Sequence, residues 1–94
     1  MSKKTPLKQT IDQLLRAYGY QDQLDEIEII KVYEGLVGQM FTNHTQKIAV
    51  KKRILYVKLD SASLKQELNY VKEGIVERLN MKLGRNLVDK IVLR

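Results

Sequence analysis

Cationic side chains gather in one stretch of this sequence. No Asp or Glu occurs between Glu34 and Asp60, and the same window holds Lys47, Lys51, Lys52, Arg53 and Lys58. Residues 47–94 carry twelve Lys and Arg against five Asp and Glu, whereas residues 1–46 carry five against six. Grouped cations neutralise phosphates and release counterions, which gives affinity for nucleic acid of any sequence. The asymmetry therefore indicates an anion-facing surface, and the alternative is a basic protein kept soluble by its charge.

A Gly-x-x-Gly motif, Gly35 to Gly38 in YEGLVGQ, has the spelling of the loop with which KH domains hold a nucleic-acid backbone. Such a loop needs exposed backbone N–H groups, usually with polar or basic residues between the glycines. Here the residues between them are Leu36 and Val37, which continue an apolar helical stripe. We predict that the motif is not a phosphate loop and that its glycines allow close packing against another element, within or at the end of a helix.

Other reactive residue types are scarce. There is no Cys and a single His, His44, which excludes thiolate metal sites and His pairs. His44 follows a helical pattern and is predicted to cap a helix C-terminus, where a cation is favoured. Ser61 and Ser63 are predicted to be helix-start residues. They are not expected to act as nucleophiles, because no general base is placed beside them. We therefore predict no enzyme activity, no cofactor, no metal and no small-molecule substrate.

Hydrophobic periodicity predicts the helices that must support the basic stretch. Thr5-Pro6 begins a first helix, which stops at Gly19. A second helix is predicted from the apolar stripe Leu24, Ile27, Ile30, Tyr33 (or Leu36), Val37 and Met40. Its first turns carry the acidic cluster Asp22, Asp25, Glu26 and Glu28. A helix start matched to the helix dipole is the favoured interpretation of this cluster, and a docking site for a basic partner is the alternative.

Two alternating segments, 45–51 and 54–60, predict a hairpin whose turn is Lys51-Lys52-Arg53. A long helix follows, with Ser61 as N-cap, Gly84 as C-terminal cap and the stripe Leu64, Leu68, Val71, Ile75, Leu79 and Leu83. Residues 87–94 predict a third strand. The order helix, helix, strand, strand, helix, strand predicts one α+β domain over residues 1–94, a three-stranded sheet with helices on one face.

Five ordered blocks resemble a known family: VYEGLVG at 32–38, NHT at 43–45, LYVKLDSASLKQEL at 55–68, VKEGIVERLNMKLG at 71–84 and VDKIVLR at 88–94. Together, over about residues 7–94, they resemble the domain-of-unknown-function family 721, the family of the bacterial replicative-helicase loader DciA. That family typically has Trp where Tyr33 stands and an aromatic where Leu64 stands. The resemblance implies a KH-like domain without the gripping loop, and a role in binding DNA and placing the replicative helicase on it.

The predicted sheet assigns a binding surface. With Ile48, Val50, Leu55, Val57 and Leu59 facing the helices, the opposite face and the adjoining turn would carry the predicted nucleic-acid-binding residues Lys47, Lys51, Lys52, Arg53, Tyr56, Lys58, Lys90 and Arg94. Tyr56 is predicted to stack on an unpaired base. The alternative for this face is a solvated strand surface on which Lys discourages edge pairing.

These observations predict a non-enzymatic nucleic-acid-binding accessory protein. Its predicted partners are single-stranded or forked DNA, or RNA, and the replicative helicase. The alternative is a protein–protein adaptor whose basic face binds an acidic partner without nucleic acid. No apolar run approaches the ~20 residues of a membrane span, and the first residues lack the apolar core of a signal peptide. A cytoplasmic protein without a membrane partner is the expectation.

Overall fold

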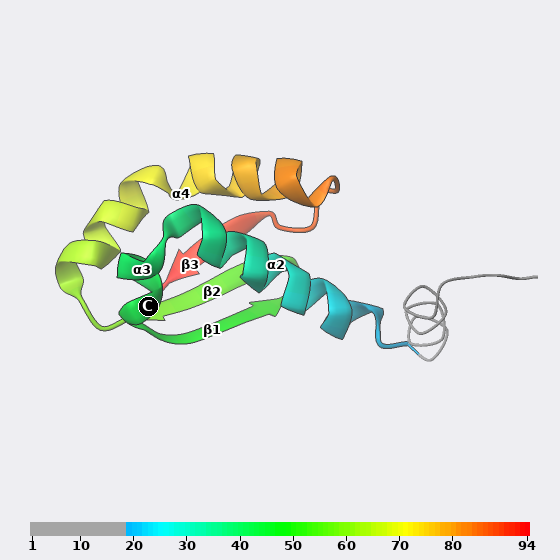
Figure 1. Ribbon diagram of the computed structural model, residues 1–94, viewed down its shortest axis with the longest axis horizontal. Coiled ribbons are helices and arrows are strands. Elements are labelled where there is room, and N and C mark those ends of the chain that lie inside the picture. Colours follow the sequence, from blue (N-terminus) through cyan, green and yellow to red (C-terminus); the bar gives the residue numbers. More distant parts are fainter. Residues whose placement is uncertain (1–18) are drawn as a thin grey trace, which may run out of the picture.

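The computed structural model describes residues 19–94, so the helix expected from Thr5-Pro6 to Gly19 lies outside the described residues. The elements follow in the order α2 (Gln21–Val37), α3 (Gln39–Asn43), β1 (Thr45–Lys51), β2 (Ile54–Leu59), α4 (Ala62–Leu83) and β3 (Lys90–Leu93) (Figure 1). The predicted α+β class, with a three-stranded sheet, is confirmed.

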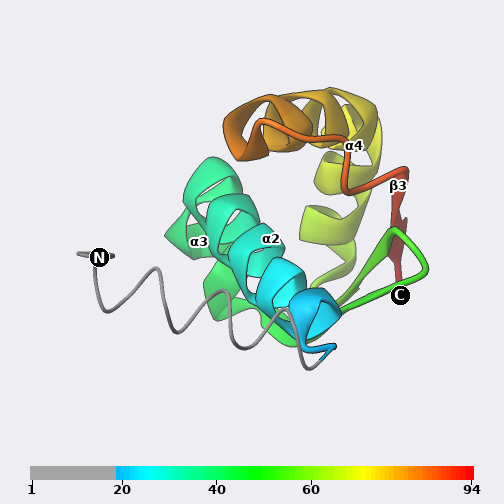
Figure 2. The same ribbon diagram turned by 90° about the vertical axis from the view of Figure 1, so that its right-hand side faces the viewer.

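The sheet has the strand order β1-β2-β3. Strands β1 and β2 pair antiparallel, with Ile48 opposite Val57 and Val50 opposite Leu55. Strand β3 pairs parallel to β2, so the long helix α4 serves as the crossover between them. Helices α2 and α4 lie on the same side of the sheet (Figures 1 and 2), which leaves the other side uncovered by helices within the described part of the chain.

The core lies between that sheet face and the helices. On β2, alternate residues are buried, and Leu55 and Val57 are both 0% exposed. Helix α2 contributes Ile29 and Tyr33, and α4 contributes Leu68, Leu79 and Leu83. Val88, in the connection after α4, and Ile91 of β3 are also buried in this core. Burial of these apolar side chains provides the main stabilising free energy of such a small domain.

Both ends of α4 are formed as the sequence predicts. The Ser61 hydroxyl accepts a hydrogen bond from the Leu64 N–H at 3.2 Å, which satisfies one of the free donors of the first turn. At the other end Gly84 adopts the left-handed conformation, with φ +73°, and its N–H donates to the carbonyl of Asn80 at 2.9 Å. These two caps fix where the crossover helix begins and ends.

Two predicted apolar stripes are partly wrong. In α2 the buried residues are Ile29 and Tyr33, while Ile27 is 62% exposed, because the helix presents a face rotated from the predicted one. Met40 is 64% exposed and belongs to the separate helix α3. In α4, Val71 is 51% exposed. The other residues of that stripe, Leu64, Leu68, Ile75, Leu79 and Leu83, are buried or packed against the core.

The Gly-x-x-Gly motif is helical up to Val37, so it does not form a loop of the KH type. The close-packing role predicted for its glycines is wrong, since a Cβ on Gly35 or Gly38 would meet no atom within 4 Å. Gly38 is needed for its backbone instead. Its φ of +88° and ψ of 173° lie in a region that is essentially restricted to glycine, and this residue separates α2 from α3.

The third strand is shorter than predicted, because Asn80 of α4 binds the residues that are predicted to begin the strand. The Asn80 Oδ1 accepts hydrogen bonds from the N–H groups of Leu87 at 3.0 Å and Val88 at 3.1 Å. Its Nδ2 donates to the Val88 carbonyl at 2.8 Å. Residues 87–89 therefore form the connection from α4, and regular pairing starts at Lys90.

Candidate nucleic-acid interface

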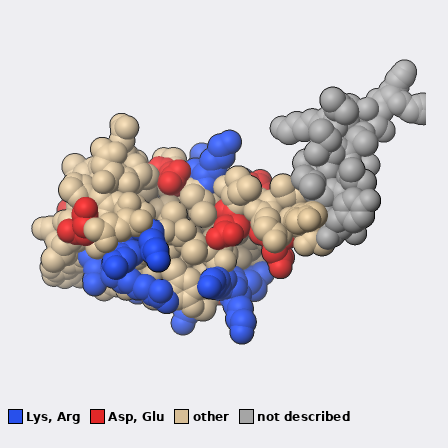
Figure 3. Space-filling model, turned by 90° about the horizontal axis from the view of Figure 1, so that it is seen from below, with Lys and Arg blue, Asp and Glu red and all other residues tan. Residues whose placement is uncertain are grey.

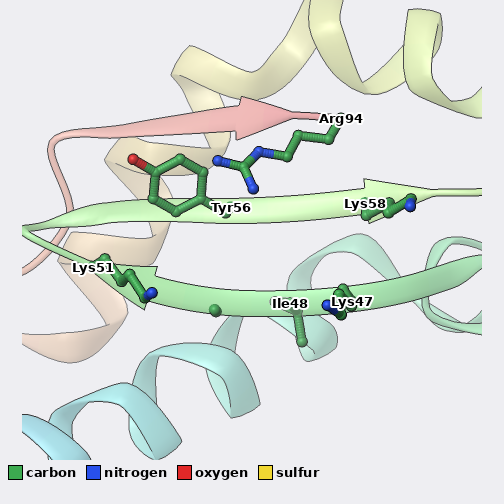
Figure 4. A pocket seen from close by; sticks show the side chains of 7 residues that line it. Lys47, Ile48, Lys51, Tyr56, Lys58 and Arg94 are labelled. Carbon is green, nitrogen blue, oxygen red and sulfur yellow. The ribbon is translucent and has the colours of Figure 1, made fainter.

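A hollow on the outer face of the sheet brings together five of the predicted binding residues. We call it the outer hollow; its volume is about 400 Å³, and it is lined by Lys47, Ile48, Ala49, Lys51, Tyr56, Lys58 and Arg94 (Figure 4). All of them come from the strands or the chain directly after β3, and none is acidic. Seen from below the sheet, Lys and Arg side chains gather over this face (Figure 3).

Strand register places the cations of the outer hollow close to one another. Lys47 of β1 lies directly opposite Lys58 of β2, next to an irregularity in the pairing between Thr45 and Lys47. Two like charges directly opposite each other on neighbouring strands destabilise a sheet. The register of the hairpin therefore places two like charges next to each other, at an electrostatic cost.

Arg94 joins the outer hollow through its backbone and its side chain. Its N–H donates to the Val57 carbonyl at 2.9 Å, which continues the pairing of β3 beyond Leu93. Its guanidinium carbon lies 4.4 Å from the centroid of the Tyr56 ring, a cation–π contact. One face of Tyr56 is therefore occupied by Arg94, whose guanidinium lies beside the ring and away from Lys58 (Figure 4).

The turn cations are placed differently from those of the outer hollow. Lys52 and Arg53 both have positive φ, 51° and 66°, as in the two-residue hairpin turns that usually contain Asn-Gly. The Arg53 Nε donates to both carboxylate oxygens of Asp89 at 3.1 Å, and its Nη2 donates to Oδ1 at 3.0 Å. These hydrogen bonds from Arg53 hold the pKa of Asp89 below its usual value. Arg53 is thus directed toward the start of β3, away from the outer hollow.

Lys90, the remaining predicted binding residue, is separated from the outer hollow. It begins β3 opposite Ile54 and lines a groove between β3 and α4, together with Lys65 and Lys72. The structure thus divides the eight predicted residues among three places: the outer hollow, the hairpin turn and the groove beside α4.

Three residues of the acidic cluster contact other elements. The Arg85 Nη2, after α4, lies 3.2 Å from both Asp25 Oδ1 and Glu28 Oε1. The Glu26 Oε2 accepts a hydrogen bond from the Val50 N–H at 3.0 Å, which satisfies a donor on the edge of β1. Asp22 alone is the acid of the first turn. The cluster therefore ties α2 to β1 and to the end of α4, and nothing in sequence spacing indicates those partners.

His44 has the structural position that the sequence predicts. It caps α3, and its Nδ1 lies 2.8 Å from the Asp60 Oδ1. Its carbonyl accepts the Asp60 N–H at 3.0 Å, so the two residues join α3 to the end of β2. Within residues 19–94, no group of three His, Asp or Glu side chains could hold a metal ion. No helix in the same range is long and apolar enough to cross a membrane.

Comparison with known proteins identifies a family. A family model described as Dna[CI] antecedent, DciA, matches residues 6–93. No curated protein and no solved structure matches the chain. The match covers all of the strands and helices described above and agrees with the resemblance carried by the five sequence blocks.

Proposed function

This chain belongs to the DciA family, whose members are helicase-loading and accessory factors of DNA replication, and we propose that it binds single-stranded nucleic acid through the outer hollow. In that role the protein would hold the nucleic-acid backbone next to the replicative helicase. Single-stranded or forked DNA is the expected ligand. RNA, which carries the same charged phosphates, is the alternative ligand.

The observation that carries this proposal is the grouping of four cations around one hollow without an acid. Lys47, Lys51, Lys58 and Arg94 come from three neighbouring strands or their extensions, and they converge on a concave surface. Lys47 and Lys58 also oppose each other in register, an arrangement with an electrostatic cost in the free protein. Binding of a polyanion removes that cost and releases counterions.

The residues of the outer hollow would divide the contacts by their chemistry. Arg94, oriented by the Tyr56 ring, presents the planar donor fork that suits a phosphate group. The lysines act as point charges that tolerate a backbone in several positions. Because the hollow offers cations and one aromatic ring, the expected binding is strongly salt-dependent and largely independent of base sequence.

The test is a fluorescence-anisotropy titration of a labelled single-stranded DNA at several salt concentrations. The patch variant combines Lys47→Glu, Lys51→Glu and Lys58→Glu, and leaves Arg53 with its Asp89 contact intact. We expect the affinity of the patch variant to fall at least about tenfold. Losing three phosphate contacts should also reduce the slope of log affinity against log salt by about 2, at roughly 0.7 per contact.

A matched control separates the outer hollow from net charge. The variant Lys31→Glu, Arg78→Glu and Lys82→Glu reverses the same number of cations at exposed helix positions and lowers the net charge of +6 equally. It should keep most of the affinity and the parental salt slope. Equal losses in both variants would contradict a localised site. Flat titrations of the parent at every salt concentration would instead favour an acidic protein as the partner of this face.

A further inference from the structure

Strand β3 leaves one edge of the sheet open beside α4. The strand is last in the order β1-β2-β3, so within the described residues it has a neighbour on one side only. A groove of about 510 Å³ runs between this edge and α4, and we call it the edge groove. Its walls include Ile91 and Leu93 from β3, Lys65 and Lys72 from α4, and Lys90 at its end.

The backbone of β3 presents hydrogen-bonding groups toward the edge groove. The N–H of Arg94 donates to the Val57 carbonyl, and the Arg94 carbonyl accepts the Leu59 N–H, so both groups of Arg94 face β2. Successive residues of a strand point these groups to opposite sides. Ile91 and Leu93 therefore direct their N–H and C=O groups away from β2, as an edge strand does where another strand can pair.

The charge of the edge groove selects the kind of segment that would fit. Lys65, Lys72 and Lys90 line it, and no acid does. Lys65 and Lys72 are two helical turns apart, about 10.5 Å along α4 at 1.5 Å per residue. The four residues of β3 extend about 13 Å at 3.3 Å each. The lysines thus flank a pairing edge about as long as four extended residues.

We propose that the edge groove binds an extended acidic segment of a partner protein, which adds to the sheet as a fourth strand beside β3. The segment's backbone would pair with the outward N–H and C=O groups of Ile91 and Leu93, and its carboxylates would meet Lys65 and Lys72. Backbone pairing supplies the affinity in this mode of recognition, and the lysines supply the preference for acidic side chains.

A nucleic-acid strand fits the edge groove less well. No aromatic residue lines it for base stacking, and the Gly-x-x-Gly motif that would clamp a sugar–phosphate backbone is helical in this protein. The edge groove also lies apart from the outer hollow, with Lys90 in the first and Lys47, Tyr56 and Lys58 in the second. This inference therefore stands independently of nucleic-acid binding by the outer hollow.

The test uses the full chain, labelled with ¹⁵N, and a blocked synthetic peptide of eight residues that alternates Glu and Val. We expect saturable shifts centred on the amides of Ile91 and Leu93, together with slower hydrogen exchange of these two amides. A matched peptide that alternates Lys and Val should bind at least about tenfold more weakly, since like charges across an interface are strongly disfavoured. Equal binding of the two peptides would overturn the acidic preference.

Two variants make the result specific. Lys65→Glu with Lys72→Glu should lower the affinity for the Glu peptide about tenfold, whereas Lys47→Glu with Lys58→Glu, on the outer hollow, should leave it unchanged. Leu93→Pro removes an outward N–H and should abolish binding if the fold persists by circular dichroism. Failure of the peptide to bind, shifts confined to the outer hollow, preferential binding of single-stranded DNA in the edge groove, or a peptide-free dimer that protects Ile91 and Leu93 would each overturn the proposal.

Discussion

The two faces of β2 differ completely although their residues alternate along one strand. Leu55 and Val57 are 0% exposed and pack against the helices. Tyr56 and Lys58, which alternate with these residues along the strand, point to the other face and line the outer hollow together with Lys47, Lys51 and Arg94. The inner face is selected by burial, where each side chain has one well-packed position. The outer face contributes little to packing, so its positions can carry like charges on neighbouring strands, such as Lys47 opposite Lys58.

The comparison predicts that the largest loss of stability follows from a change on the inner face. Leu55→Ala removes a fully buried side chain, and we expect the free energy of unfolding to fall by about 3 kcal/mol. Urea denaturation would measure this loss. The remaining folded protein should bind single-stranded DNA with parental affinity. If the folded fraction of Leu55→Ala bound single-stranded DNA poorly, the division between a stabilising and a binding face would be wrong.

An outer-face change should do the reverse. Ala49 lies opposite Tyr56 in the outer hollow, so Ala49→Glu places a carboxylate among the cations. We expect the affinity for single-stranded DNA to fall about tenfold, about 1.4 kcal/mol, with the unfolding midpoint nearly unchanged. Ala49→Gln, of similar size but neutral, is the control. A loss as large for Gln as for Glu would point to blocked space in the hollow, with no role for its charge.

Much of the architecture is predictable because it depends on local sequence. The alternation in residues 45–59 identifies both strands and assigns their two faces, since residues i and i+2 share a side. Ser61 and Gly84 identify the ends of α4 because capping involves only neighbouring backbone groups. Lys47, Lys51, Tyr56 and Lys58 of the outer hollow follow from this alternation, whereas Ile48, expected on the helix side, also lines the hollow next to the irregular pairing of β1. The structure places five of the predicted eight binding residues together.

The rest depends on contacts between distant residues, which periodicity does not encode. Apolar residues at 27, 29 and 30 allow more than one buried face of α2, and packing against the sheet selects Ile29. Asp89 removes Arg53 from the predicted surface through an ion pair across 36 positions. Asn80 shortens β3 because its side-chain oxygen accepts the N–H groups of Leu87 and Val88, which would otherwise be available to a neighbouring strand. An Asn next to the stripe residue Leu79 and four residues before the capping Gly84 is the signal that could have suggested this last role.

A third change tests the core that packs against the inner face of β2, at Tyr33 of helix α2. The Tyr33 hydroxyl is buried and has no hydrogen-bond partner among the described residues. Tyr33→Phe removes that unsatisfied group, and we expect the free energy of unfolding to rise by about 1 kcal/mol. Thermal or urea unfolding would measure it. A less stable variant would reveal a partner for this hydroxyl and make Tyr33 a polar anchor of the core.

The same residue gives a pH dependence of known sign. Burial, with a smaller contribution from Glu34, raises the pKa of Tyr33 from 10.0 to about 12. In the unfolded chain Tyr33 loses its proton near pH 10, while in the folded protein it stays neutral. Stability from this group is therefore fully present below pH 10 and is lost as the pH rises toward 12. Tyr33→Phe should lose less stability than the parent between these pH values, and identical pH profiles would contradict the assignment.

The smallest expected effect concerns Tyr56, whose ring makes the cation–π contact with Arg94 on the outer face. If the ring mainly orients Arg94, Tyr56→Phe should bind single-stranded DNA like the parent, and Tyr56→Ala should lose about two- to fivefold, the equivalent of roughly 0.5–1 kcal/mol. Arg94→Ala in the Tyr56→Ala background should then cost less than it does alone, because the two residues act as a pair. Additive losses, with more than about tenfold for Tyr56→Ala, would show instead that the ring stacks on a base and that Arg94 moves aside when the strand binds.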